Sequence, residues 1–250
     1  MSPAPAPQAI GVLAKFTENS ALQGSFAEHI HALESIQPPV RVVAVRTPQD
    51  LEQCRALIIP GGESTTISLL IRKSGLYEPL KEFIARAKED EGRSVWGTCA
   101  GMILLAREID GPTSEGWERF DAMDVKVARN QYGRQLQSFS YSVSLPFISR
   151  PSAPVLAIFI RAPVLHSLLP SSSSSQPVEP LARIPSSLIP SPPRAKAVTN
   201  GSITLGPNAD VVMYRQGGLL ASSWHPELNK EDARVHEWWV REMVLKGEEA

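Results

Sequence analysis

The five residues Gly-Thr-Cys-Ala-Gly at positions 97–101 constrain this chain more than any other stretch. Short apolar residues lead into them and the helix-forming run 102–106 follows, a pattern typical of a strand, a tight turn and a helix with a nucleophile at the turn. The flanking glycines leave room for neighbouring elements, and the start of a helix favours the thiolate of Cys99 over the thiol. The same residues also suit a small buried cysteine between helix-packing glycines, so both interpretations stay open on these five residues alone.

A second pattern near the end of the chain supplies the partners that a nucleophilic cysteine needs. The segment 222–227, Ser-Ser-Trp-His-Pro-Glu, directly follows an apolar run that predicts the last strand. In an extended segment residues two apart point the same way, so Glu227 can hold one ring nitrogen of His225 while the other faces Cys99. Cysteine, histidine and glutamate then act as nucleophile, general acid/base and orienting carboxylate in acyl transfer. His-Pro-Glu can also be an ordinary loop sequence without a catalytic role, but its occurrence together with the glycine-flanked cysteine favours the triad.

Backbone N–H groups near this cysteine can stabilise charge on a reacting carbonyl oxygen. Gly61 and Gly62 follow the apolar run 57–59, and only glycine lets the backbone approach a bound carbonyl so closely. We therefore expect the N–H groups of Gly62 and of Ala100, at the start of the helix, to form an oxyanion hole.

The other charged candidates have less distinctive settings. Arg129 and Arg161 flank the ends of strand-like segments. They are either ordinary surface residues or groups that bind the α-carboxylate of a substrate through a bidentate guanidinium. Four histidines have no setting like that of His225, and we expect them at the surface or on helix faces: His29, His31, His166 and His236.

Apolar runs alternate with helical stretches through the first half of the chain. Such alternation favours a parallel sheet covered on both faces, so the predicted fold is an α/β three-layer sandwich with a mostly parallel, flavodoxin-like sheet. Active sites of such sheets lie beyond the carboxyl ends of the strands, which places Gly62 and Cys99 at one edge. We predict strands at 9–14, 40–45, 57–59 and 94–97, helices at 22–36, 67–73, 78–88 and 229–246, antiparallel additions at 124–127, 139–145 and 156–160, and further strands at 210–214 and 219–223.

Composition separates an ordered body from two other segments. Residues 167–196 hold nine serines and seven prolines, too few apolar groups to offset chain entropy, and predict a disordered insertion. Residues 1–8 alternate proline and alanine without a basic or long apolar segment, and predict a disordered N-terminus rather than a signal peptide. We expect 9–250 to form a single domain around the insertion.

Charge and cysteine content exclude several classes of function. The net charge of -1 gives no general attraction to nucleic acid or to an anionic membrane. Two cysteines, Cys54 and Cys99, cannot build a disulfide scaffold, which fits a cytoplasmic protein. The spacing of histidine, cysteine and aspartate indicates no metal site, and we expect neither metal nor cofactor.

The chain resembles the class I (triad) glutamine amidotransferases and, among them, the glutaminase subunits of pyridoxal 5′-phosphate synthase. The matching segments are 22–29, 60–66, 97–101, 129–130, 132–135, 159–163 and 225–228. The resemblance implies that L-glutamine is hydrolysed through a thioester on Cys99, with His225 and Glu227 completing the triad. It also implies a (β/α)8-barrel synthase subunit as the partner that receives the ammonia. The implied glutamine contacts are Gly62, Glu63, Ser64, Arg129, Ile160 and Arg161.

One departure from the family bears on function. The family runs from its first strand straight into Leu-Gln-Gly, whereas residues 15–21 intervene here before 22–24. Polar, turn-forming residues at 17–20 favour an outward surface loop that leaves 22–24 in place. Two alternatives to the glutaminase remain: a non-catalytic partner subunit with an unformed oxyanion hole, and another amidase or γ-glutamyl hydrolase of the same fold.

Overall fold

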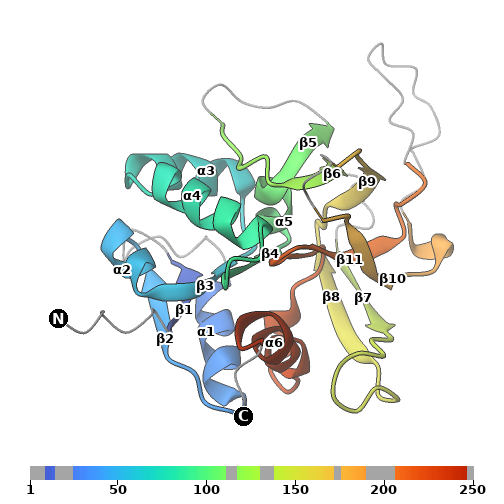
Figure 1. The fold of residues 1–250 in the computed structure, drawn as a ribbon. Coiled ribbons are helices and arrows are strands. Elements are labelled where there is room, and N and C mark those ends of the chain that lie inside the picture. The colour runs from blue at the N-terminus through green and yellow to red at the C-terminus, as the bar shows by residue number, and fades with distance from the viewer. Residues whose placement is uncertain are drawn as a thin grey trace.

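The computed structural model describes residues 9–14, 25–110, 117–129, 138–171, 176–189 and 206–246. Its central element is a seven-stranded sheet in the order β10-β11-β12-β4-β3-β1-β2 (Figure 1). Six of these strands run in the same direction, and only β11 among the seven is antiparallel to its neighbours, β10 and β12. The strands are β1 (Ala9–Leu13), β2 (Val42–Val45), β3 (Cys54–Ile59), β4 (Ser94–Thr98), β10 (Glu179–Arg183), β11 (Val211–Gln216) and β12 (Leu219–Ser222).

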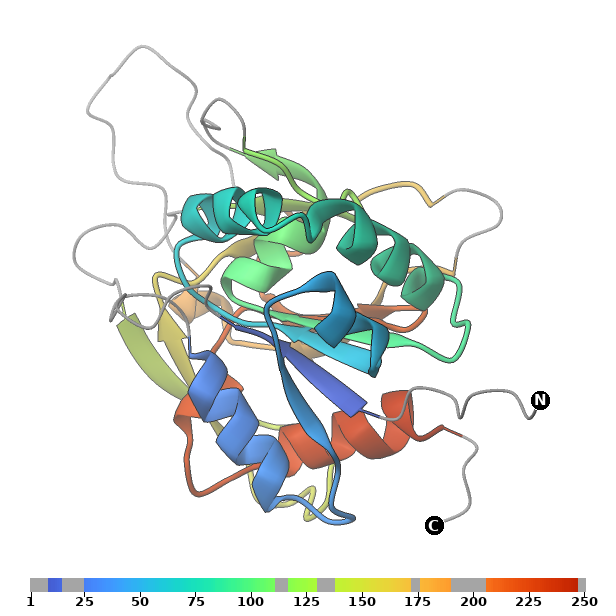
Figure 2. The same cartoon turned by 90° about the vertical axis from the view of Figure 1, so that its left-hand side faces the viewer.

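Helices cover both faces of this sheet, as Figure 2 shows from the side. On one face lie α3 (Ser64–Lys73), α4 (Tyr77–Lys88) and α5 (Ala100–Leu105), and on the other α1 (Phe26–Ser35) and α6 (Arg234–Trp239). The short helix α2 (Pro48–Glu52) joins β2 to β3, and α6 continues as the π-helical segment η3 (Val240–Val244). The mostly parallel sheet between helical layers confirms the predicted α/β fold.

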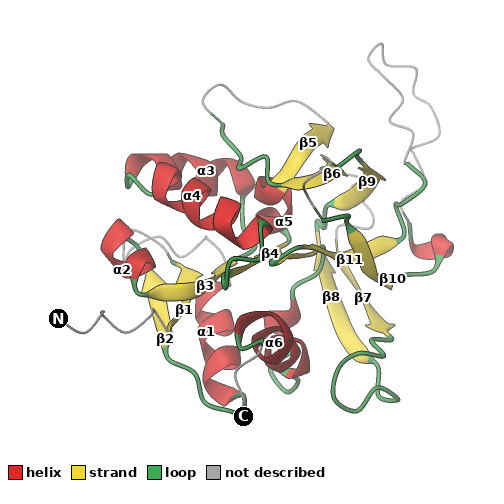
Figure 3. Ribbon diagram, viewed as in Figure 1, coloured by secondary structure: helices red, strands yellow, loops and turns green. Residues whose placement is uncertain are grey.

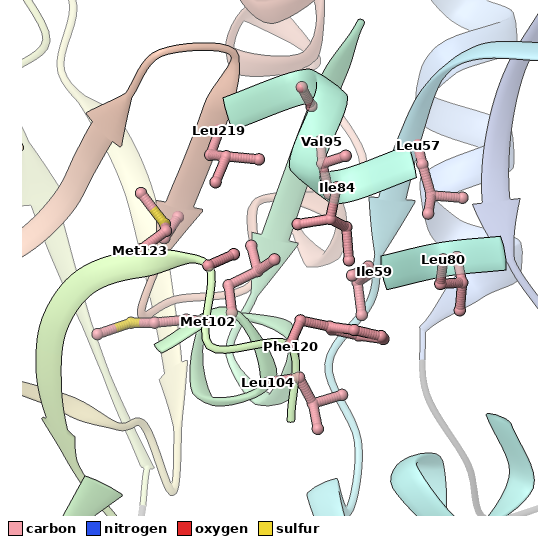
Figure 4. Close-up of a cluster of buried hydrophobic side chains, with 14 of the residues drawn as sticks. Leu57, Ile59, Leu80, Ile84, Val95, Met102, Leu104, Phe120, Met123 and Leu219 are labelled. Carbon is pink, nitrogen blue, oxygen red and sulfur yellow. The ribbon is translucent and has the colours of Figure 1, made fainter. Parts of the chain in front are cut away.

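The central strands have two buried faces, which explains their unbroken apolar sequence. Along β3, Leu57 and Ile59 point toward α4 and pack with Leu80 and Ile84 (Figure 4). Ile58, between them, belongs to the second cluster on the opposite face. All three β3 side chains are 0% exposed, as expected for a parallel sheet covered on both sides.

Five further strands form two smaller sheets beside the main one (Figure 3). A three-stranded sheet contains β5 (Ala106–Asp110), β6 (Met123–Ala128) and β9 (Val164–Leu168), and β7 (Ser138–Val143) pairs with β8 (Val155–Ile160). The expectation that 124–127, 139–145 and 156–160 extend the main sheet is therefore wrong. β11 and β10 already occupy the edge next to β12, so the antiparallel additions come from these later strands instead.

The serine- and proline-rich tract is ordered in part. Residues 179–183 form β10 and pair with β11, so the expectation of disorder is wrong there. Pro180 is tolerated because β10 is the edge strand of the sheet, and Ala182 and Ile184 are each 4% exposed because they pack in the core. The 3-10 turn η1 (Ser186–Leu188) follows. Residues 190–196 of this tract, the predicted disordered 1–8 and the family departure at 15–21 lie outside the described residues.

Candidate active site

Cys99 stands alone between β4 and α5 in a strained backbone conformation. Its φ of 48° and ψ of -100° are unusual for a residue other than glycine and typical of the sharp turn that presents a nucleophile. The Cys99 N–H donates to the Ser222 carbonyl at 2.8 Å. A Cβ on Gly101 would lie 2.1 Å from the Ile59 carbonyl oxygen, so the helix can start this close to β3 only with glycine. The predicted strand, turn and helix are thus present.

His225 and Glu227 lie just beyond β12, around the start of the 3-10 turn η2 (Pro226–Leu228). The Nδ1 of His225 is 2.7 Å from Oε1 of Glu227, and the His225 N–H donates to the Ile158 carbonyl at 2.9 Å. A Cβ on Gly61 would lie 2.3 Å from Cε1 of the His225 ring. The absence of a side chain at Gly61 therefore lets the ring lie over the end of β3.

The electrostatics of the site favour a charged histidine. Burial alone would lower the pKa of His225, but hydrogen bonding to Cys99 and Glu227, and the charges of both, outweigh it and raise the pKa to about 10. Burial would raise the pKa of Glu227, yet the field of His29, the hydrogen bonds from His225 and Ser25 and the charge of His225 lower it to about 2. At neutral pH an imidazolium therefore stands beside an ionised carboxylate.

A cavity of about 440 Å³ lies over Cys99. All six residues that the resemblance assigns to glutamine line it, which brings together segments that follow β3, β6 and β8. The Cys99 thiol lies 3.8 Å from the carbonyl oxygen of Ile160. Lining residues that sequence reasoning did not assign are Ser25, Gly61, Ile103, Pro163 and Leu228.

Two of the predicted glutamine contacts have further partners. The Glu63 carboxylate caps α3 by accepting from the N–H groups of Thr65 at 3.0 Å and Thr66 at 2.7 Å. The Arg129 guanidinium lies over the Trp117 ring, 5.1 Å from its centroid. Ala100, predicted for the oxyanion hole, is the first residue of α5, where backbone N–H groups lack acceptors within the helix.

Two histidines were misjudged from sequence. His29 on α1 and His236 on α6 lie on helix faces, one of the two expected settings, but each is 0% exposed, so the expectation of a surface position is wrong for them. His29 Nε2 lies 3.2 Å from Glu227 Oε2, and the Ser25 hydroxyl donates to Glu227 Oε1. The available signal was the spacing of Ser25 and His29, which places both on one face of a helix that also reaches the site.

The described residues contain no group of three or more histidine, cysteine, aspartate or glutamate side chains that could hold a metal ion. Among the helices in these same ranges, none is long and apolar enough to cross a membrane.

Comparison with known proteins identifies the family. The chain belongs to the SNO glutamine amidotransferase family, whose profile matches residues 20–179 and 182–245. It is 37% identical over 228 residues to the pyridoxal 5′-phosphate synthase subunit PdxT of Pyrococcus horikoshii, covering 89% of this chain and 96% of that protein. The PdxT of Herpetosiphon aurantiacus is 40% identical over 220 residues, covering 88% of this chain and 96% of that protein. These matches confirm the resemblance seen in the motifs.

A solved structure supports the same fold. A crystal structure of a glutamine amidotransferase superimposes with a TM-score of 0.66 at 34% sequence identity, covering 93% of this chain and 97% of that one.

Proposed function

We propose that this protein hydrolyses L-glutamine to glutamate and ammonia, and that it supplies the ammonia to a pyridoxal 5′-phosphate synthase. The observation that carries the proposal is the 2.7 Å contact between His225 and Glu227 beside a cysteine at a strained turn, under the same cavity. The family and the relatives named as synthase subunits support the biological assignment.

The reaction begins at Cys99. Its thiolate attacks the carbon of the glutamine side-chain amide, and the N–H groups of Gly62 and Ala100 stabilise the oxyanion. The His225 imidazolium gives its proton to the departing nitrogen, which releases ammonia and leaves a γ-glutamyl thioester.

Hydrolysis of the thioester completes the cycle. Neutral His225 removes a proton from water, which attacks the thioester carbon, and collapse of the intermediate returns the Cys99 thiolate and releases glutamate. Glu227 keeps the ring oriented through Nδ1 and stabilises its positive charge without itself reacting.

Substrate selection falls to the other cavity residues. The guanidinium groups of Arg129 and Arg161 bind the α-carboxylate of glutamine, which distinguishes it from a simple amide. Gly62, Glu63, Ser64 and Ile160 complete the contacts. Neither metal nor cofactor enters this mechanism.

The partner is a (β/α)8-barrel synthase subunit in the cytoplasm, to which this chain binds as the glutaminase. Residues 15–24, which include the family departure, lie next in the chain to Ser25 in the cavity wall. We therefore expect the synthase to influence activity through this segment.

One assay tests the proposal. The purified chain is given L-glutamine with and without its synthase subunit, and glutamate and ammonia are measured. Production of both, stimulated by the synthase, is the expected result. A chain that binds the synthase but stays silent is the non-catalytic subunit, and one that prefers other amides or γ-glutamyl peptides is a different hydrolase of this fold.

A further inference from the structure

Behind the triad, two buried histidines continue the line of contacts away from the cavity. His29 Nε2 is 3.2 Å from Glu227 Oε2, and His29 Nδ1 is 2.9 Å from His236 Nε2. The residues come from α1, the η2 turn and α6, and α1 contacts both of the other elements. The mechanism above uses neither histidine.

Chemistry fixes the direction of the protons in this line. A ring nitrogen 3.2 Å from an ionised carboxylate oxygen is electrostatically favoured there only when it carries a proton, so Nε2 of His29 is the protonated nitrogen. Burial lowers the pKa of both rings, that of His236 to about 3, so both rings are neutral at neutral pH. A neutral His29 with Nε2–H has an accepting Nδ1, and His236 therefore donates to it through its own Nε2–H.

The contacts through His29 and His236 matter most for Oε2, the second carboxylate oxygen of Glu227. Oε1 of Glu227 accepts from His225 and from Ser25. Oε2 is buried and accepts no hydrogen bond of good geometry from the residues that the structure describes, so the N–H of His29 at 3.2 Å is the contact that stabilises its charge. The same N–H lies 3.2 Å from the Thr98 hydroxyl, which joins the nitrogen to the residue before Cys99.

An aromatic wall holds the two rings in place. The Trp96 ring lies edge-on to His29, with centroids 5.9 Å apart, and tilted to His236 at 5.0 Å. Because these rings pack together in a buried site, His29 has little freedom to turn its N–H away from Glu227.

We infer that His29 and His236 are positioning residues, which hold the Glu227 carboxylate so that one oxygen faces His225 while the other stays charged in the interior. The inference rests on the proposed glutaminase function. A carboxylate without this support is free to rotate or to take up a proton, and either change leaves His225 poorly oriented. The titratable groups facing this carboxylate are His225 from its own turn, His29 from α1 and His236 from α6, with Cys99 beyond His225.

Amide side chains separate positioning from simple packing. Glutamine can place an N–H where His29 has Nε2, whereas asparagine reaches only the place of Nδ1. We expect His29→Asn to lower kcat about tenfold to a hundredfold with KM for glutamine little changed, because a displaced catalytic group slows chemistry more than binding. His29→Gln should retain most of the activity. The control is His31→Asn, which changes an exposed histidine of the same helix and should match wild type.

A second pair of variants, at His236 on α6, tests the same inference if a His29 variant does not fold. His236→Gln retains the N–H toward His29 and should be nearly active, whereas His236→Asn should lose activity severalfold. All variants are assayed as the full chain with its synthase subunit, and thermal unfolding is measured for each.

A readout without glutamine distinguishes this inference from the proposed function. Iodoacetamide alkylates the Cys99 thiolate, and mass spectrometry follows the rate against pH. Cys54 does not compete because burial, with the nearby Asp50 charge, raises the pKa of its thiol to about 12, and Cys99→Ala gives the blank. In His29→Asn the alkylation midpoint should move to higher pH, because weaker support of the imidazolium weakens the thiolate.

The outcomes are separable. A slow His29→Asn with a shifted alkylation profile, beside a nearly normal His29→Gln, supports the inference. Equal losses in both variants, or an unchanged His29→Asn, overturn it. If wild type hydrolyses no glutamine but the alkylation profile still shifts, the proposed function fails while the positioning of Glu227 stands.

Discussion

The proposed catalytic side and the proposed substrate side of the cavity come from different parts of the fold. Gly62, Cys99 and His225 follow β3, β4 and β12, which are adjacent strands of the main sheet. Arg129 and Arg161 follow β6 and β8, which belong to the two smaller sheets. The proposed reacting groups are thus fixed by one backbone framework and the proposed binding groups by others. Changes on the first side should lower kcat, and changes on the second should raise KM.

The most severe test of the catalytic side is Cys99→Ala. We expect glutamine hydrolysis to fall at least about 10⁴-fold, because the Cys99 thiolate is the proposed nucleophile. Folding and synthase binding should persist, since the change is small. The matched control is Cys54→Ala at the other buried cysteine, which should keep its activity and lose about 1 kcal/mol in the free energy of unfolding. Substantial glutaminase activity in purified Cys99→Ala would contradict the assignment of Cys99 as the nucleophile.

A smaller loss is expected from Glu227→Gln. This change removes the charge that stabilises the imidazolium, and we expect kcat to fall about a hundredfold or more, though less than in Cys99→Ala. Steady-state kinetics with the synthase present gives the comparison. Glu231→Gln, at an exposed glutamate nearby in the chain, serves as the control. Equal turnover in Glu227→Gln and wild type would reduce the triad to a cysteine and a histidine.

On the substrate side, Arg161→Gln should raise KM for glutamine about tenfold to a hundredfold, the loss of one charge-assisted hydrogen-bonding group, while kcat changes little. Arg183→Gln provides the control, because Arg183 pairs with Asp210 at 2.7 Å on β10 and does not line the cavity. A fall in kcat with constant KM in Arg161→Gln would break the division between the two sides.

A separate prediction concerns stability and pH. The pKa of His225 is about 10 in the folded protein against 6.5 for an ordinary histidine, so protonated His225 stabilises the fold fully below pH 6.5 and loses that effect as pH rises toward 10. Chemical denaturation of wild type and His225→Gln should converge over this range, by at most about 1.4 kcal/mol for each pH unit. Parallel curves would show that His225 is not held as an imidazolium.

The patterns that were readable from sequence are local ones. Cys99 stands in a five-residue turn, and His225 and Glu227 are two residues apart. Their proposed roles could therefore be predicted from residues that are close together in the chain. The helices predicted at 67–73 and 78–88 match α3 and α4 closely, because the apolar residues that give each helix its periodicity pack against the sheet.

The features that could not be predicted from the sequence depend on contacts between residues far apart in the chain. His29 and His236 are 207 residues apart, and nothing near either one signals that they meet in the interior. Serine and proline content hid β10, whose strand character comes from pairing with β11. Deleting 171–193 would therefore remove an edge strand and core side chains such as Ala182, although composition alone predicts a disordered insertion there.

The hydrogen bond from the Cys99 N–H to the Ser222 carbonyl joins the proposed nucleophile to β12, the strand that ends three residues before His225. Opening this bond requires β4 and β12 to separate at the centre of the sheet, an event on the scale of global unfolding. The Cys99 amide should therefore be among the slowest to exchange with deuterated solvent. Heat inactivation should then coincide with loss of the whole fold, without an earlier stage in which a folded enzyme has lost its catalytic geometry.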